Sequence, residues 1–133
     1  MKLKNNIFNN STIVQALAII FKHNDFEDDK LKLICKFTEM IIPAEKLYHT
    51  TRDKFAFKYA KKDSDNKVIF NEKTNRPIIV NEVAFNSAMN TLGEEEIDQE
   101  FPDIAFSFNE LPKELKNSLT IMELKNIFTI EGV

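Results

Sequence analysis

The residues whose types could do chemistry concentrate in KLYHTTRDKFAFKYAKK, residues 46–62. Cationic side chains at this density attract phosphates and carboxylates, and interleaved aromatic rings can stack on bases. Three interpretations remain open: docking on another part of the chain or on a subunit, a solvated face, or binding of a nucleotide or nucleic acid. The candidate ligand- or partner-binding residues, called the basic strip below, are His49, Arg52, Lys54, Lys58, Lys61 and Lys62.

A catalytic use of this run would depend on His49. Asp53 follows it by one helical turn, as a general base and its orienting carboxylate could be arranged. The chain has no accompanying serine or cysteine nucleophile motif, and it lacks a P-loop, a G-x-G-x-x-G and a C-x-x-C. The sequence therefore predicts no catalytic residues, no cofactor and a protein that is not an enzyme.

A calcium loop is the first metal site to consider, because Asp63 and Asp65 match its first two ligand positions. The match then fails. Lys67 puts a cation at the fifth position, Val68 replaces the glycine of the sharp turn, and Thr74 replaces the bidentate glutamate. We predict that this stretch stops a helix and that the chain has no metal site.

Charge is segregated along the chain although the net charge is only −3. Residues 1–62 hold 12 basic and 7 acidic residues, whereas residues 63–133 hold 6 and 14. The acidic run EEEIDQE, residues 94–100, is more typical of a solvated acidic loop, or of a surface that meets a basic partner, than of a metal site. The segregation favours docking of halves or of protomers, and the alternative is a monomer whose two surfaces neutralise each other. The overall acidity disfavours nucleic acid as the partner.

The single cysteine, Cys35, excludes an internal disulfide and any all-cysteine zinc site, and its apolar helical context predicts a core thiol. Lys2 and Lys4 before IVQALAIIF imitate a signal peptide. However, Gln15 interrupts the apolar run, and KHND follows where a small-residue cleavage site would stand. We expect no signal, no membrane span and a cytoplasmic protein.

The clearest element is a helix from residue 28 to residue 61, whose apolar positions recur every three or four residues. Leu47 is expected to widen this stripe, and Pro43 predicts a kink or a break near Ile42. The stretch NNSTIVQ reads as the start of a first helix, with a Thr12–Gln15 capping box and with Asn10 or Ser11 as alternative caps. The segment KLKNNIF before it reads as an edge strand or an extended arm.

The middle of the chain is expected to reverse direction. KVIF and PIIV are short, apolar and β-branched, and they predict a small two-stranded β-hairpin with Pro77 at a strand start. Asn81 then caps a third helix that ends at Gly93. Alternating apolar residues predict extended segments over residues 97–108. A helical turn follows Pro112, and a last helix starts near Ser118 or at a Thr120–Glu123 capping box.

The layout resembles a family of small phage proteins of unknown function, found as short reading frames in prophages of low-GC bacteria. The resemblance rests on MKLKN, YAKKDSDNKVIF, NRPIIV, FNSAMNTLGEEE and DIAFSFNELP…LTIMELKNIF. In that family the long helix also ends in a tyrosine, followed by an acidic turn and a β-like excursion before the return helix. The resemblance implies a phage origin and the host cytoplasm, and it implies no activity.

Together these observations predict one domain, residues 1–133, of the α+β class and mainly α. A long kinked helix packs with shorter helices, and the small two-stranded β-hairpin completes it. We expect a phage-type accessory protein that acts without catalysis by binding another protein or by forming a homo-oligomer. The alternative is an anti-defence protein that sequesters a signalling nucleotide or blocks a host immune effector.

Overall fold

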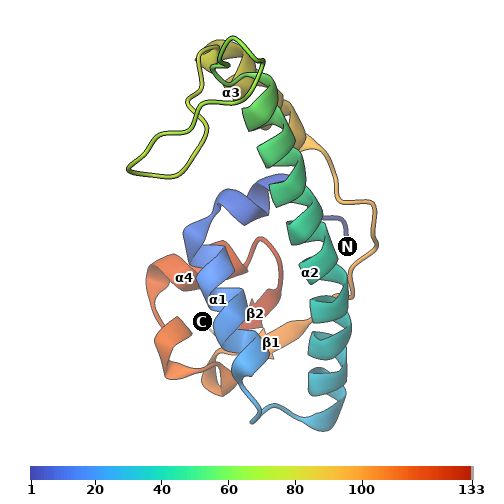
Figure 1. Cartoon of the computed structure of the whole chain (residues 1–133). Coiled ribbons are helices and arrows are strands. Elements are labelled where there is room, and N and C mark those ends of the chain that lie inside the picture. The colour runs from blue at the N-terminus through green and yellow to red at the C-terminus, as the bar shows by residue number, and fades with distance from the viewer. Residues whose placement is uncertain (133) are drawn as a thin grey trace.

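A computed structural model describes residues 1–132 and shows a mainly helical chain (Figure 1); Val133, the last residue of the predicted domain, lies outside them. The helices are α1 (Ser11–Lys22), α2 (Asp28–Lys58), α3 (Glu82–Glu94) and α4 (Ser118–Leu124). The strands are β1 (Ala105–Ser107) and β2 (Thr129–Glu131), which pair in parallel. Short 3-10 helices span Asn5–Asn9, Phe108–Glu110 and Lys113–Leu115, the last confirming the helical turn predicted after Pro112.

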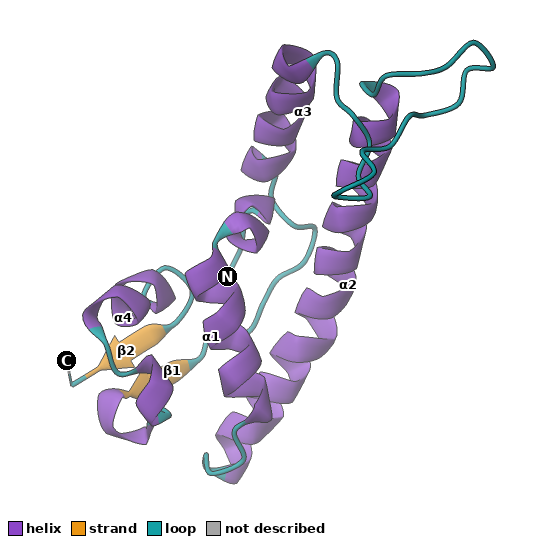
Figure 2. Cartoon of the chain, turned by 60° about the vertical axis from the view of Figure 1, so that its left-hand side comes forward, coloured by secondary structure: helices purple, strands orange, loops and turns teal. Residues whose placement is uncertain are grey.

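Two regions are visible in Figures 1 and 2. A compact end gathers α1, α4, β1 and β2 against the first half of α2. The second half of α2, the loop of residues 59–81 and α3 extend away from it, and we call residues 49–94 the arm. Figure 2 shows α3 on one side of α2 and the far end of the loop on the other.

The core lies at the compact end and is rich in phenylalanine. The fully buried ring of Phe37 on α2 packs 5.3 Å, centre to centre, from both Phe101 and Phe128. Phe106 on β1 packs at the same distance from Phe26 and Phe128. The extended segments predicted over residues 97–108 are confirmed only in part, because Ala105–Ser107 form a strand whereas residues 98–99 bend and Phe108 begins a 3-10 helix. The apolar side chains of Ile97, Phe101, Ile104 and Phe106 are buried in this core.

The long helix is continuous over 31 residues, about 46 Å at ~1.5 Å per residue. Of the kink or break predicted near Ile42, the break does not occur, and α2 ends at Lys58 and not at residue 61. Pro43 is tolerated because it lies on the exposed side, where water can satisfy the carbonyl that loses its N–H donor. The axis of α2 curves gently in Figures 1 and 2.

The predicted hairpin is also wrong, because the two-stranded sheet is β1 with β2 and is parallel. Residues 68–70 and 77–79 do approach each other, but only through the isolated bridge of Phe70 with Pro77. Each segment has a second isolated bridge to the chain just after α2, Lys62 with Val68 and Ala60 with Ile79. The pairing is shared among three segments, so no two of them build a ladder.

Asparagine side chains start three of the helices. Asn10, Asn81 and Asn117 accept hydrogen bonds from backbone N–H groups three residues on, at 3.1, 3.1 and 2.9 Å. The predicted cap at Asn81 is confirmed, and Asn10 was one of the stated alternatives. The capping boxes predicted at 12–15 and 120–123 are wrong, because an asparagine just upstream takes the cap position in each case.

Two further expectations are corrected. Cys35 is exposed and is no core thiol, because it falls beside the buried stripe of Ile34, Phe37 and Ile41 and not within it. Gly93 does not end α3, which continues to Glu94. Gly93 is buried instead, and a Cβ at this position would lie 3.4 Å from the Cβ of Asn6, so it serves close packing.

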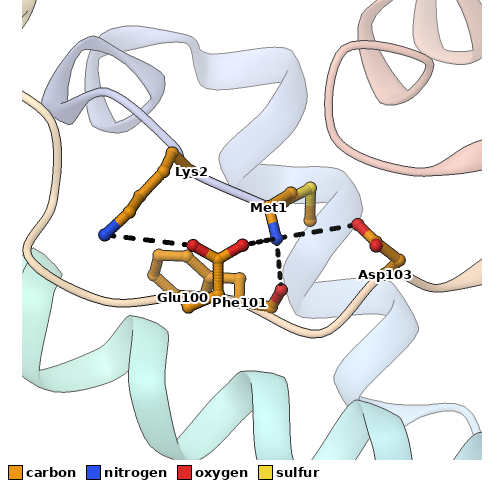
Figure 3. A network of polar contacts seen from close by, with 5 residues as sticks. All are labelled: Met1, Lys2, Glu100, Phe101 and Asp103. Carbon is orange, nitrogen blue, oxygen red and sulfur yellow. Dashed lines mark hydrogen bonds and ion pairs between the residues drawn. The ribbon is translucent and has the colours of Figure 1, made fainter.

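The N-terminal segment is extended as far as residue 4 and runs beside residues 95–101, where single backbone hydrogen bonds join the two. Asn5–Asn9 then forms a 3-10 helix. Of the two predicted alternatives, the edge strand is wrong and an extended arm is present only as far as residue 4. The N-terminal ammonium donates to Glu100 Oε1 at 2.7 Å and to the Phe101 carbonyl at 2.6 Å (Figure 3). The hydrogen bond to Glu100 raises the pKa of this amine and lowers that of the carboxyl.

Candidate functional site

A cleft of about 480 Å³ lies in the arm where α2, the 59–81 loop and the start of α3 meet. We call it the arm cleft. Each of the three elements contributes lining side chains, and the loop supplies half of them. The lining residues are Arg52, Asp53, Ala56 and Phe57 from α2, Phe70, Asn75, Arg76, Pro77 and Ile79 from the loop, and Phe85 from α3.

The local sequence explains why the loop folds back onto the side of α2 that lines the cleft. Residues 52, 53, 56 and 57 are spaced at one helical turn and form one side of α2. In the loop, Asn71 Oδ1 accepts from the N–H groups of Lys73 and Thr74, at 2.8 and 3.1 Å. Asn75 takes the left-handed conformation, φ 55°, which asparagine tolerates well. This turn brings Phe70 and Arg76 back to the side of α2 formed by residues 52, 53, 56 and 57.

Half-exposed aromatic rings form one part of the cleft. Phe57 and Phe70 pack edge to face, with ring centres 6.1 Å apart, and they remain 41% and 45% exposed. Val80 and Val83, where the loop leads into α3, are more exposed still, at 62% and 83%. An apolar cluster left open in this way at the end of an arm is typical of a binding surface.

Both arginines of the chain line this one cleft. Arg52 makes a long contact of 3.3 Å with the neighbouring Asp53. The guanidinium of Arg76 has neither an ion pair nor a hydrogen bond within residues 1–132. Its planar fork is therefore free to hold a carboxylate or a phosphate with two hydrogen bonds.

The residues of the basic strip do not share one surface in the structure. Arg52 faces the arm cleft, whereas Lys54 and Lys58 are exposed on a different side of α2. Lys61 and Lys62 follow the helix and are exposed too, and Lys62 Nζ donates to the carbonyl of Lys58 at 3.2 Å. Of the six residues only Arg52 lines the arm cleft, so they do not converge on one ligand.

His49 does not form the catalytic arrangement considered above. Its ring packs against Tyr48, with centres 5.5 Å apart, and its Nδ1 is buried without a hydrogen-bond partner. Asp53 contacts Arg52 instead. Within the described residues no three His, Cys, Asp or Glu side chains gather as a metal site would need.

Sequence reasoning missed Arg76 and the three phenylalanines at positions 57, 70 and 85 as site residues. One signal was present, because arginine is scarce in this chain while lysine is abundant. The proximity of Arg76 to Arg52 depends on the return of the loop, which local patterns do not encode.

Comparison with known proteins does not extend this description. No family model matches the chain, and neither the curated proteins nor the solved structures gave a match. None of the helices within residues 1–132 has the length and hydrophobicity that a membrane span requires.

Proposed function

We propose that this chain is a small accessory protein of the phage type that acts without catalysis and binds an acidic segment of another protein through the arm cleft. The observation that carries the proposal is the meeting of both arginines with three phenylalanines in one open cleft. Arginine and large aromatic side chains are the types most enriched at the energetic centres of protein interfaces.

The cleft offers two kinds of contact side by side. Phe57, Phe70 and Phe85 can receive an apolar or aromatic anchor of about one side chain in size. Arg76, which has no partner among residues 1–132, can hold a carboxylate next to that anchor. Lys61 and Lys62 are exposed nearby in the chain and add positive potential that speeds the encounter with an acidic partner.

Selection from a displayed random-peptide library tests this function. We expect the enriched peptides to combine an aromatic or aliphatic residue with Asp or Glu. Arg76→Ala should weaken their binding at least about tenfold, as expected for an interface arginine. The matched control is Lys113→Ala, which removes an exposed cation at the compact end. Peptides without acidic residues, or equal loss in both variants, would contradict the proposal.

A second candidate is the anti-defence protein that sequesters a signalling nucleotide, and the same cleft supports it. Two guanidinium groups could hold phosphates while a phenylalanine ring stacks on the base. Thermal unfolding with cyclic and ADP-ribose-type nucleotides tests this candidate, because a ligand of the folded state raises the apparent stability. A shift that disappears in Arg76→Ala would favour the nucleotide, and no shift would leave the protein partner.

A further inference from the structure

A second hollow, of about 590 Å³, lies between the middle of α2 and the segment that follows α3. An adjoining hollow of about 420 Å³ continues it between the last turns of α2 and α3, and the two share Leu92 and Glu95 in their lining. We call the two hollows together the acidic groove. Figure 2 shows α3 beside the second half of α2, with the segment that follows α3 running on beside the middle of α2.

The α2 side of the groove is one mainly apolar stripe. Met40, Ala44, Leu47, Thr51 and Phe55 line it and recur every three or four residues, so they lie on one side of the helix. From the first to the last of them the stripe is about 22 Å long at ~1.5 Å per residue. Leu47 belongs to the predicted apolar stripe, yet its side chain is 68% exposed. An exposed leucine in a hollow gains stability when another surface covers it.

The α3 side of the groove is formed by short side chains. Ala84, Ser87, Ala88 and Thr91 line it at helical spacing. The distance at which helices pack depends on the side chains between them, and short ones permit a close approach. The groove therefore suits an occupant that is itself a helix and that lies along α2.

Every charged residue that lines the groove is acidic. Glu39 stands on the α2 side, and Glu95, Glu96 and Asp98 stand on the segment opposite. Carboxylates thus flank the apolar stripe on both sides. In the described part of the chain no three of them gather as a metal site would need, so their spacing favours a partner with several separate cations.

The cations close to this wall are used by other carboxylates. Lys4 pairs with Glu94 at 2.8 Å, and Glu96 attracts it only at longer range. Lys2 and the N-terminal ammonium both pair with Glu100 (Figure 3). The four carboxylates of the groove have no ion pair within residues 1–132, so their negative potential can act on a partner.

We infer that the acidic groove binds a basic amphipathic helix of another protein. Apolar side chains on one face of this helix cover Met40 and Leu47. Its lysines or arginines reach Glu39 on one side, and Glu95 and Glu96 on the other. Charge complementarity selects this occupant, because the same carboxylates repel nucleic acids and anionic lipids. The inference does not rest on the arm cleft, whose lining shares no residue with the groove.

Synthetic peptides of about 16 residues, which span the groove as a helix, test the inference on the full chain. The probe carries leucine at helical spacing and lysine at the other positions. One control has the same composition in scrambled order, and a second has glutamate in place of lysine. Fluorescence anisotropy should show binding of the probe, binding of the scrambled peptide weaker by at least about tenfold, and no binding of the glutamate peptide. Binding of the probe should weaken from about 0.05 M to about 0.5 M salt.

A first pair of variants tests the apolar stripe. Leu47→Ala should weaken binding of the probe by at least about tenfold, because it removes the side chain that the peptide covers. The matched control is Ile42→Ala, which also removes an exposed apolar side chain of α2, but one outside the groove. The control should bind the probe as the unsubstituted chain does.

A second pair of variants tests the carboxylates. Glu95→Gln with Glu96→Gln should weaken binding of the probe by at least about tenfold and reduce its salt dependence. Glu27→Gln with Glu114→Gln removes the same charge from exposed positions at the compact end and should bind normally. Circular dichroism establishes folding, and because the two groove variants alter opposite walls, either one remains informative if the other unfolds.

Three results would overturn the inference. The first is a probe that does not bind, or that binds no better than its scrambled control. The second is an equal loss in the groove variants and their matched controls, since net charge alone would then explain the binding. The third is a dimer of the peptide-free chain that Leu47→Ala dissociates in sedimentation equilibrium, because a second copy would then occupy the groove.

Discussion

Arg52 and Arg76 differ in kind from the lysines that surround them. A guanidinium is planar, always charged and able to hold two oxygens at once, whereas an ammonium is a hydrated point charge. In this chain the lysines of α2 other than Lys30 are exposed, and both arginines line a cleft that also contains phenylalanine rings. Residue chemistry of this kind supports the arm cleft as the specific site and the lysines as its electrostatic surroundings.

Arg76→Lys separates these two roles. It keeps the charge and removes the fork, so we expect most of the affinity for a carboxylate-bearing peptide to be lost, by about tenfold. Titration calorimetry of the substituted and unsubstituted chains measures the difference. If the lysine variant binds as tightly as the unsubstituted chain, positive charge alone explains the binding. The contact of the Arg76 guanidinium through two hydrogen bonds would then be incorrect.

His49 offers a residue-scale test of the cost of an unpaired buried nitrogen. Its buried Nδ1 lacks a partner, and an unsatisfied buried polar atom is destabilising. We expect His49→Leu to increase the free energy of unfolding by up to about 1 kcal/mol, measured by urea denaturation. Peptide binding should be unchanged; its loss would show that the imidazole contributes to the site.

Glu110 gives a pH dependence of known sign. Its partial burial alone would raise its pKa. Hydrogen bonds from Lys30 Nζ and from the Ser107 N–H, both at 2.6 Å, outweigh this and hold the pKa below the ordinary 4.5. The stability that these contacts contribute is fully present above pH 4.5 and is lost as the pH falls through the lower pKa of the folded state.

The corresponding measurement compares the chain with Glu110→Gln. We expect the variant to be about 1 kcal/mol less stable at neutral pH, because the ion pair with Lys30 is lost and an amide oxygen accepts weaker hydrogen bonds than a carboxylate does. Near about pH 3 the difference should shrink, since the glutamate is then becoming protonated. A difference that is constant with pH would mean that packing and not charge accounts for it.

The elements differ in how far the sequence reveals them. The helices were predictable because each carries a periodic apolar side and a polar start, as Asn81 and Glu82 provide for α3. The parallel pair β1–β2 was not, because each strand has three residues and its partner is distant in the chain. KVIF and PIIV have strand-like composition, but each bridges the chain after α2 as well as the other segment, so no ladder forms between them.

A substitution at Pro43 tests whether α2 only tolerates this proline or requires it for packing. It lies within a continuous helix, where proline removes one backbone hydrogen bond. We expect Pro43→Ala to raise the free energy of unfolding by about 1 to 3 kcal/mol, since the helix already accepts the position. Lys46→Ala, an exposed substitution one turn on, should change it little. A destabilised alanine variant would mean that the curvature near Pro43 is required for packing at the compact end.

At the scale of the whole molecule, the segregated charge seen in the sequence has two outcomes. Part of it is neutralised internally, because Lys4, Lys30 and the N-terminal ammonium pair with Glu94, Glu110 and Glu100. The lysines of the second half of α2 stay unpaired within residues 1–132. Sequence patterns could not separate these outcomes, because they depend on where the segment after α3 runs relative to α2.

The most direct test of the central claim is hydrogen–deuterium exchange of the full chain with and without a selected acidic peptide. Our account predicts slower exchange confined to the arm, in the loop of residues 68–80 and the adjacent start of α3. The compact end and residues 94–99 should exchange as before. Protection centred on the compact end or on residues 94–99, with the loop unchanged, would contradict the assignment of the arm cleft as the binding site.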